Sequence, residues 1–337
     1  MTKKYDYSVL IGRFQPPHKA HIEIIKQALE FSQSILIVVG SANAALNIKN
    51  PFTHNERDEM IRASLEDVGV ASSRYKIAFV SDQLYSLNGW ITDVQQLIRE
   101  NTQGSVCLAG HHKDSSSYYL DVFKEYDFVE IGNVQDNLSS TSIREGLFEH
   151  RLVYDALPDA VKRFLYDWVT TEEYERLRDE WSFIKKYNER WNIAPYPPTF
   201  VTTDAVVVQS GHVLLVKRRA QPGRGLWALP GGFLDPNELI LDGIVRELKE
   251  ETKIKLAART LKDKIKRVQV FDAPNRSLRG RTVTHAGLIQ LDDTADLPKV
   301  KGSDDAEVAA WFPLSQIEPS FMYEDHYDII KAMTGGL

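Results

Sequence analysis

The 337-residue chain has one cysteine, no apolar run long enough to cross a membrane and no excess of basic residues. A single thiol, Cys107, rules out an internal disulfide framework and a cysteine-based zinc site, and its apolar neighbours predict a packed core position. A transmembrane helix needs about 20 consecutive apolar residues, which no segment provides. The apolar stretch after Lys3 and Lys4 is too short for a signal peptide. We therefore expect a cytoplasmic protein with no membrane partner.

Positive charge is also scarce, because 41 lysines and arginines face 47 aspartates and glutamates, a formal net charge of −6. Nucleic-acid-binding domains usually present a basic face, and no basic run stands out here. We therefore expect small-molecule partners and no nucleic acid. The length favours roughly two domains.

Three glutamates, Glu247, Glu250 and Glu251, fall at positions i, i+3 and i+4 of a helical pattern, where they share one face. Such like charges repel, and a divalent cation such as Mg²⁺, which takes hard oxygen ligands, would offset the repulsion. An adjoining apolar stripe predicts that the helix packs on a sheet. Its members are Ile240, Leu241, Ile244, Val245 and Leu248. Taken alone, an acidic run of this kind is usually a solvated surface.

The spacing of the whole segment from residue 232 to residue 254 resembles the Nudix hydrolase box. The matching residues are Gly232, Glu238, Arg246, Glu247, Glu250, Glu251 and Ile254. The resemblance implies a Nudix α/β/α sandwich with a mixed sheet, catalytic roles for Arg246 and Glu250, and a site for Mg²⁺, with Mn²⁺ as the alternative. The implied metal ligands are Gly232, Glu247, Glu250 and Glu251. Lys253 replaces the glycine that closes the helix in this family, a departure that concerns the C-terminal turn and not the metal face.

The first 150 residues alternate apolar strand runs with helical patterns, which predicts a parallel, doubly wound sheet. The strand candidates are Tyr7–Ile11, Ile35–Gly40, Lys76–Val80, Val106–Ala109 and Phe128–Ile131. The helix candidates lie near residues 20–32, 54–67, 89–100 and 115–125. Ligands in such folds bind at the carboxyl ends of the strands.

Two segments of this part are suited to phosphate. The first strand ends in GRFQPPHKAH (residues 12–21), where His18 and His21 begin a helix whose free N–H groups and partial positive charge attract anions. Arg13 adds a donor for a developing charge. SSTSIRE (residues 139–145) offers hydroxyl and N–H donors together with Arg144. A His-x-x-His pair taken alone is more often an exposed turn.

Together, these segments resemble the signatures of the nucleotidyltransferase superfamily, and NPFTHNER (residues 50–57) narrows the resemblance to NMN adenylyltransferases of the archaeal type. Ala20 and Leu138 depart from the family's glycine and isoleucine, and neither change removes a chemical group. The resemblance implies a Rossmann-like domain in which Mg²⁺ bridges the phosphates. The implied catalytic residues are Arg13, His18, His21, Arg57 and Arg144. The implied ATP-binding residues are Gly12, Phe14, His18, His21, Gly110, Ser139, Ser140, Thr141 and Arg144.

The same resemblance implies that Asn50, Asp82 and Trp90 bind NMN. Trp90 would stack on the nicotinamide ring, although packing on the core is an equally good interpretation. His111 and His112 follow a predicted strand, where they either contact adenosine or lie exposed in a loop.

The second half carries further candidates for substrate contact. Arg276, Arg279 and Arg281 lie within six residues and either bind the diphosphate or adenine of ADP-ribose or form a solvated basic turn. In similar hydrolases a carboxylate on a late loop is the general base, and Glu307 is the first candidate and Asp305 the second. We expect a hairpin from residue 199, strands at 265–271 and 282–291, and a final helix at 323–333.

The expected organisation is a nucleotidyltransferase domain (1–150), a helical connector and linker (151–198) and a Nudix domain (199–337). The aromatic stripe of Glu172–Trp191 packs between the domains, against a second subunit of a homo-oligomer, or simply closes a domain, which is the favoured interpretation. Pro195–Pro198 predicts a stiff linker.

Both halves resemble the bifunctional NMN adenylyltransferase/Nudix hydrolases. The resemblance implies that one domain transfers the adenylyl group of ATP to NMN, giving NAD and pyrophosphate. The other would hydrolyse ADP-ribose to AMP and ribose 5-phosphate with Mg²⁺. The alternatives are another nucleoside diphosphate derivative, such as NADH or a dinucleoside polyphosphate, or a non-catalytic ADP-ribose sensor. The full set of box carboxylates argues against the sensor, which has no need of a metal cluster.

Overall fold

The computed structural model describes residues 4–111, 122–132, 139–151, 154–303 and 306–335. The chain forms two compact units, Met1–Arg178 and Asp179–Leu337. Helix α6 (Glu172–Glu189) begins in the first unit and ends in the second. The predicted domain limits at residues 150 and 198 stay a prediction.

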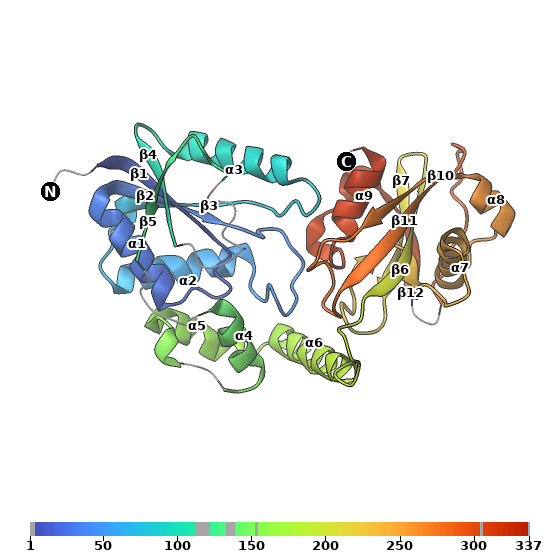
Figure 1. Ribbon diagram of the computed structural model, residues 1–337, viewed down its shortest axis with the longest axis horizontal. Coiled ribbons are helices and arrows are strands. Elements are labelled where there is room, and N and C mark those ends of the chain that lie inside the picture. Colours follow the sequence, from blue (N-terminus) through green and yellow to red (C-terminus); the bar gives the residue numbers. More distant parts are fainter. Residues whose placement is uncertain (1–3, 112–121, 133–138, 152–153, 304–305, 336–337) are drawn as a thin grey trace. The chain divides into compact units, whose positions relative to one another are not determined.

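The first unit is built on a parallel sheet of five strands in the order β3-β2-β1-β4-β5 (Figure 1). The strands are β1 (Tyr5–Gly12), β2 (Ser32–Val39), β3 (Tyr75–Phe79), β4 (Val106–Gly110) and β5 (Asp127–Glu130). The strand order reverses at β1 and β4, and the carboxyl ends of these neighbours form the crevice where such sheets bind ligands. The predicted doubly wound sheet is confirmed.

Helices cover both faces of this sheet because its strands are apolar on both faces. Ile35 and Ile37 of β2 pack with the apolar residues of α1 and α2, whereas Leu36 and Val38 pack on the other face with Val94 and other residues of α3. The helices of this unit are α1 (Lys19–Phe31), α2 (His54–Asp67), α3 (Leu87–Asn101), α4 (Ser140–Phe148) and α5 (Asp159–Trp168). The helix predicted near 115–125 falls largely outside the described residues.

The second unit contains a mixed sheet in the order β10-β11-β6-β7-β12, with β8 paired to β7 and β9 paired to β6. The strands are β6 (Phe200–Gln209), β7 (His212–Arg218), β8 (Trp227–Ala228), β9 (Gly231–Phe233), β10 (Ile265–Phe271), β11 (Thr282–Gln290) and β12 (Ala306–Pro313). Strands β6 and β11 are parallel, and the other pairs are antiparallel. The predicted mixed sheet is confirmed, and β12 was not among the strands predicted from the sequence.

Helices α7 (Ile240–Thr252) and α9 (His326–Thr334) lie on opposite faces of this sheet, with α8 (Ala258–Asp263) beside α7 (Figure 1). Ile244, Val245 and Leu248 of α7 are buried against the sheet as predicted. Leu241 is 44% exposed, so its place in the apolar stripe was wrong: it lies past the edge of the buried face.

The C-terminal turn of α7 keeps the form that a glycine would give it. Lys253 has the left-handed backbone conformation with a φ of 49°, and its N–H donates to the Lys249 carbonyl at 3.1 Å. The replacement of the family's glycine by Lys253 thus leaves this turn in the conformation that glycine adopts more easily.

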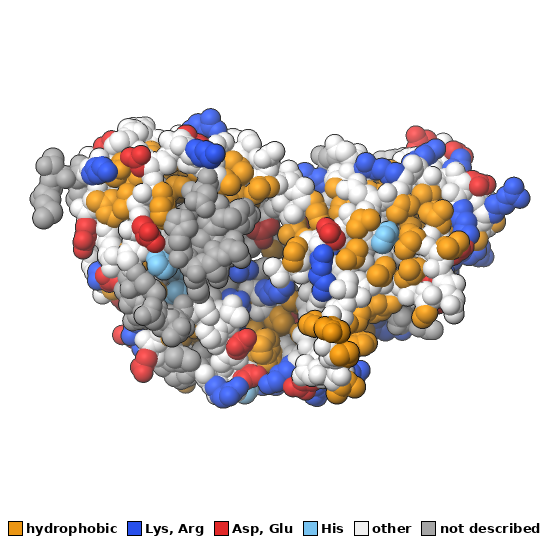
Figure 2. All heavy atoms as spheres, viewed as in Figure 1, with side chains coloured by type: hydrophobic (Ala, Val, Ile, Leu, Met, Phe, Trp, Pro, Cys, Tyr) orange, Lys and Arg blue, Asp and Glu red, His pale blue; other side chains and the backbone are white. Residues whose placement is uncertain are grey.

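The structure bears on two expectations from composition, which concern a basic surface and a membrane-spanning helix. Figure 2 shows acidic and basic side chains interspersed over the face that it draws, with no single basic surface. Among the described residues, no helix is both long and apolar enough to span a bilayer.

Candidate active sites

The two predicted phosphate segments of the first unit meet at the carboxyl end of β1, where residue pairs that are 124 and 129 positions apart in the sequence are hydrogen-bonded. The Ser140 hydroxyl donates to the Pro16 carbonyl at 3.3 Å, and Nη1 of Arg144 donates to the Gln15 carbonyl at 2.7 Å. Ser139 caps α4, since its Oγ accepts from the Ser142 N–H at 3.2 Å. The start of α4 and the loop after β1 thus form one site. Thr141 is exposed at this site and accepts from Nη2 of Arg144 at 3.2 Å.

His18 and His21 stack with a ring-centroid distance of 3.7 Å at the start of α1. The His18 N–H donates to Nδ1 of His21 at 3.2 Å, so neutral His21 carries its proton on Nε2. Nε2 can then donate to a phosphate oxygen. Arg13 lies five residues before His18 and is exposed. Its guanidinium can also donate to a phosphate oxygen.

Phe14 and Gly12 support this arrangement from within the fold. Phe14 is only 1% exposed, and its ring lies 4.7 Å from that of His21. A Cβ on Gly12 would approach the Phe14 ring to 3.0 Å, so the glycine makes room for Phe14. Gly110 is buried at the end of β4, next to β1 in the sheet. Contact of these three residues with ATP stays a prediction.

Arg57 differs from the expectation of a phosphate-contacting residue, because its side chain is completely buried. Its guanidinium donates to the carbonyls of Arg13 at 2.8 Å, Gly40 at 2.6 Å, Ser41 at 3.0 Å and Thr53 at 3.2 Å. Burial lowers the pKa of Arg57 to about 10, which still leaves it charged near neutral pH. In this structure Arg57 fastens the loop after β1 to the segments that follow β2 and precede α2. Burial also lowers the pKa of Arg144 to about 10.

The three residues predicted to bind NMN have different surroundings. Asn50 has a buried Oδ1 without a hydrogen-bond partner among the described residues, so it can accept from a ligand. The Asp82 carboxylate accepts from the Ser41 hydroxyl at 2.6 Å. Trp90 is half-buried on α3, with its ring 6.0 Å from that of Phe123. The packing of Trp90 matches the core interpretation, and stacking on a ligand stays a prediction. His111 follows β4, and His112 lies outside the described residues.

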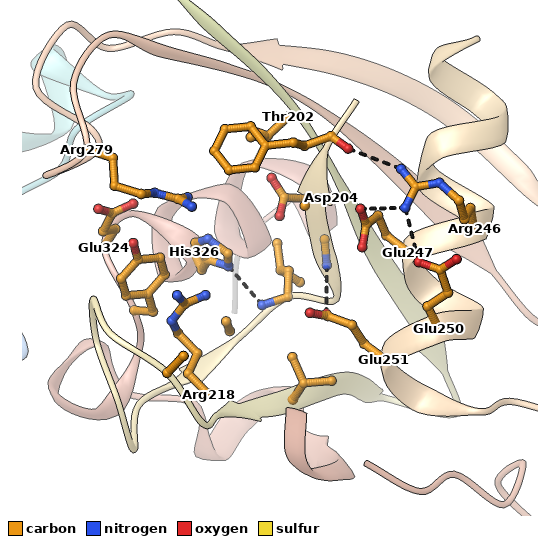
Figure 3. A pocket seen from close by; sticks show the side chains of 18 of the residues that line it. Thr202, Asp204, Arg218, Arg246, Glu247, Glu250, Glu251, Arg279, Glu324 and His326 are labelled. Atoms are coloured by element: carbon orange, nitrogen blue, oxygen red, sulfur yellow. Dashed lines mark hydrogen bonds and ion pairs between the residues drawn. The ribbon is translucent and has the colours of Figure 1, made fainter. Parts of the chain in front are cut away.

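In the second unit, Arg246 organises the glutamates of α7 (Figure 3). It donates to both oxygens of Glu238 at 2.8 and 2.9 Å, to Glu247 at 2.7 Å and to Glu250 at 3.1 Å. It also donates to the Phe233 carbonyl at 3.1 Å. Arg246 therefore orients two of the predicted metal ligands.

Glu251 and Glu247 are carboxylates in an environment that disfavours their charge. Burial raises the pKa of Glu251 to about 8, although the Gly231 N–H donates to its Oε2 at 3.0 Å. Burial also raises the pKa of Glu247. A Cβ on Gly232 would lie 2.5 Å from Oε1 of Glu247, so only glycine lets the loop approach this closely.

These features fit a hard divalent cation, which would offset the cost of two partly buried, neighbouring negative charges. Within the described ranges, no group of three acidic, histidine or cysteine side chains is already arranged to hold an ion, and Arg246 contacts Glu247 and Glu250 instead.

These carboxylates line a cavity of about 470 Å³. Arg276 and Arg279 also line it, but Arg281 does not and bonds instead to the Asp272 carbonyl. Contact of these arginines with ADP-ribose stays a prediction. Arg276 is buried and donates to Asp325 through Nε and Nη2, each at 2.8 Å. Arg279 lies over the Phe233 ring, 4.9 Å from its centroid. Only Arg279 of the three therefore lines the cavity without a buried ion pair.

Glu307 was expected on a loop, and that expectation was wrong. It lies on β12, exposed, with a carboxylate oxygen 3.8 Å from Nζ of Lys217, and it is not among the described residues that line the cavity. Its role as general base stays a prediction without support from this geometry. Asp305 lies outside the described residues.

The cavity also contains residues that the sequence did not single out. They are Asp204, Arg218, Tyr323, Glu324 and His326. Asp204 is buried, accepts from the Thr284 hydroxyl, and has a pKa that burial raises to about 6. The polar Thr-Thr-Asp interruption in the apolar strand β6 was the one sequence signal for Asp204. Tyr323, Glu324 and His326 lie at least 69 residues beyond the Nudix box, and Arg218 lies 14 residues before it. No local pattern marks these residues.

Two family models match successive parts of the chain. The cytidylyltransferase-like model matches residues 9–146, and the NUDIX domain model matches residues 198–333. A nicotinamide/nicotinic acid mononucleotide adenylyltransferase of Acinetobacter baylyi is 38% identical over 181 residues, 53% of this chain and 94% of that protein. An ADP-ribose pyrophosphatase of Methanocaldococcus jannaschii is 31% identical over 131 residues, 39% of this chain and 70% of that protein.

Solved structures of a Francisella tularensis protein match nearly the full length, and one of them has bound ligands. It is a bifunctional NMN adenylyltransferase/ADP ribose pyrophosphatase from Francisella tularensis, complexed with AMP and a manganese ion. The TM-score is 0.94 at 36% identity, over 98% of this chain and 99% of that one. The chain therefore belongs to the family of bifunctional NMN adenylyltransferase/ADP-ribose pyrophosphatases.

Proposed function

We propose that this chain is a bifunctional enzyme of NAD metabolism that makes NAD from ATP and NMN and hydrolyses ADP-ribose. The observation that carries the proposal is the presence of both sites in one chain whose fold matches a bifunctional relative over 98% of its length. The joining of the loop after β1 to the start of α4 supports the first activity. The arginine-organised glutamates of α7 support the second.

In the first reaction, a phosphate oxygen of NMN attacks the α-phosphorus of ATP, and pyrophosphate leaves. No covalent enzyme intermediate is needed, so the protein aligns the reactants and stabilises charge. Nε2 of His21 and the guanidinium of Arg13 are the donors we assign to the phosphates. Arg144 joins the two phosphate segments, and Arg57 holds the backbone that positions Arg13.

In the second reaction, water attacks one phosphorus of the ADP-ribose diphosphate, the bridging P–O bond breaks, and AMP and ribose 5-phosphate form. Glu247, Glu250, Glu251 and the Gly232 backbone would hold the divalent cation. We propose Mg²⁺, with Mn²⁺ as the alternative, and such a cation neutralises phosphate charge and acidifies bound water. Arg246 orients Glu247 and Glu250, and Gly231 orients Glu251.

The test is a product assay of the purified chain with ATP plus NMN and, separately, with ADP-ribose, each with Mg²⁺ and with a chelator. Formation of NAD in the first reaction and of AMP in the second is expected. A parallel panel with NADH and a dinucleoside polyphosphate measures the preference for ADP-ribose. Faster hydrolysis of a panel member would replace the proposed substrate, and binding of ADP-ribose without turnover would indicate a sensor.

We also propose that the protein acts in the cytoplasm, where ATP and pyridine nucleotides are available, and cell fractionation tests this location. Assembly into a homo-oligomer stays a prediction that sedimentation analysis can test.

A further inference from the structure

The hydrolase cavity has two chemically different walls (Figure 3). The glutamates of α7 form one wall. Arg218, Arg279 and His326 lie on the opposite side of the cavity from them, together with Glu324, whose carboxylate accepts from the Leu278 N–H at 2.8 Å. The first wall suits a cation, and the second suits the anionic part of a substrate that the cation does not cover.

His326 is held in place at both its backbone and its ring. It is the first residue of α9 and is 6% exposed. The Leu229 N–H donates to its Nδ1 at 2.8 Å. The preceding residue, Asp325, is held by the two 2.8 Å hydrogen bonds from Arg276. Backbone and ring are thus both anchored.

The bond from Leu229 also fixes where the proton of His326 lies. Because Nδ1 accepts a hydrogen bond, the neutral ring carries its proton on Nε2. The side chain lines the cavity, so Nε2–H is the donor available to a ligand. Burial, followed by the charges of Arg276, Arg218 and Arg279, lowers the pKa of His326 well below its usual value. The ring therefore donates without adding another positive charge.

Arg218 and Arg279 supply positive charge, but their guanidinium groups lie against aromatic rings and fix the position of a ligand oxygen less strictly than His326. The Arg218 guanidinium lies 4.0 Å from the centroid of the Tyr323 ring, and its Nε donates to the Pro222 carbonyl at 2.8 Å. Arg279 lies over Phe233 at the other side of the same wall. A wall of this kind attracts a phosphate, and one anchored donor among the cations can select the position of a single oxygen.

We propose that Nε2–H of His326 donates a hydrogen bond to a non-bridging oxygen of the substrate's diphosphate, on the side of the cavity away from the glutamates. The proposal rests on the proposed hydrolysis of ADP-ribose and assigns a substrate-positioning contact to a residue outside the Nudix box.

Two substitutions of His326 test the roles of its two ring nitrogens separately. In His326→Asn, the amide oxygen can replace Nδ1 as the acceptor for Leu229, but the donor toward the cavity is lost. In His326→Gln, the longer side chain places an amide N–H near the position of Nε2, but the acceptor for Leu229 is lost. We expect His326→Asn to keep the melting temperature and raise KM for ADP-ribose about tenfold or more, the scale of a lost hydrogen bond to a charged group. We expect His326→Gln to melt earlier but to keep KM within about threefold of the parent value.

A purely structural role for His326 predicts the opposite order, with a parent-like KM in His326→Asn and the larger defect in His326→Gln. That order would overturn the proposal. The matched control is His212→Asn. Nδ1 of His212 also has a backbone partner, in this case the Ser210 carbonyl at 2.8 Å, to which it donates, but the residue does not line the cavity. Adenylyl transfer by each variant reports whether the first unit remains folded, and the melting temperature of the hydrolase unit reports the folding of the second.

The products identify the oxygen. AMP carries one of the two phosphates of ADP-ribose and ribose 5-phosphate carries the other. We expect His326→Asn to weaken inhibition by one of them by about the same factor as KM. Unchanged inhibition by both would overturn the proposal.

Binding of ADP-ribose to the full chain in the presence of a chelator, followed by calorimetry, gives a readout without turnover. Failure of the parent protein to hydrolyse ADP-ribose would count against the proposed function alone. Equal affinities of parent and His326→Asn for ADP-ribose in the chelator would count against the contact from His326.

Discussion

Gln15 and Phe52 are joined by two reciprocal hydrogen bonds: Nε2 of Gln15 donates to the Phe52 carbonyl at 2.9 Å, and the Phe52 N–H donates to Oε1 of Gln15 at 3.0 Å. Gln15 is 1% exposed and follows β1, whereas Phe52 precedes α2. One side-chain amide thus connects the segment assigned to ATP with the segment assigned to NMN.

Gln15→Ala should weaken adenylyl transfer, because it leaves the backbone groups of Phe52 unpaired and releases the two segments. A lost buried hydrogen-bonding partner costs about 1–3 kcal/mol. We expect a lower melting temperature, higher KM values for ATP and NMN, and unchanged ADP-ribose hydrolysis. Gln33→Ala, at an exposed glutamine of the same unit, is the control. Parent-like KM values for both substrates would show that the connection has no part in binding.

His21→Ala should reduce adenylyl transfer and leave ADP-ribose hydrolysis unchanged. Removal of a preorganised donor to a reacting phosphate lowers the rate about 10²–10³-fold, by analogy with oxyanion donors. The measurement is kcat for both reactions in the same preparation. His18→Ala should have a similar effect, because it removes the ring that stacks on His21. If both variants make NAD at the parent rate, the histidine pair is only structural.

Glu250→Gln should separate catalysis from stability. The Glu250 side chain is 59% exposed and pairs with Arg246, so its neutralisation should change the metal-free stability by only a few tenths of a kcal/mol, in the range of exposed ion pairs. ADP-ribose hydrolysis should fall by orders of magnitude, and NAD synthesis should persist. Thermal unfolding without metal and hydrolysis across a Mg²⁺ titration test both parts. Parent-like hydrolysis with parent-like Mg²⁺ dependence would remove Glu250 from the metal site.

Glu251 should make the metal-free protein less stable as the pH rises. Its pKa in the folded protein, about 8, is above the ordinary glutamate value of 4.5, so between these values the folded state binds more protons than the unfolded state. Its contribution to stability is therefore largest below about pH 4.5 and is lost as the pH rises through 8.

The measurement is thermal unfolding from pH 5 to pH 9, with chelator and with Mg²⁺. The cation should protect more strongly at higher pH, because its binding displaces the proton. Glu251→Gln should flatten the pH dependence in chelator. An equally steep dependence in that variant would assign it to other groups.

Separation of the two activities should depend on where the chain is cut. Glu180 of α6 is 1% exposed, and its carboxylate accepts from the Gly223 N–H at 2.8 Å. Gly223 packs on Tyr323 so closely that a Cβ would approach that ring to 2.2 Å.

A fragment of residues 172–337 keeps Glu180 and should hydrolyse ADP-ribose, whereas a fragment of residues 196–337 should melt earlier and hydrolyse it more slowly. A fragment of residues 1–195 should retain adenylyl transfer. Glu180→Gln in the full chain is the matched test of the carboxylate. Equal activity of the two hydrolase fragments would show that α6 does not support the cavity.

The amino-acid sequence by itself determined the features that depend on spacing along the chain. The helical period places Glu247, Glu250 and Glu251 of α7 on one face whatever surrounds them. Alternating apolar strand and helix patterns likewise predicted the parallel sheet, because each element needs only its own apolar face to form.

Tertiary structure decided which of the marked side chains reach a ligand. Arg57 and Arg276 both lie in segments assigned to ligand binding. The guanidinium of Arg57 donates to backbone carbonyls, whereas that of Arg276 donates to Asp325. Glu307 lies on a strand. His326, which is 75 residues beyond Glu251 in the sequence, lines the cavity from a helix. Burial and hydrogen-bond partners arise from contacts between distant segments, so no local pattern in the sequence could assign them.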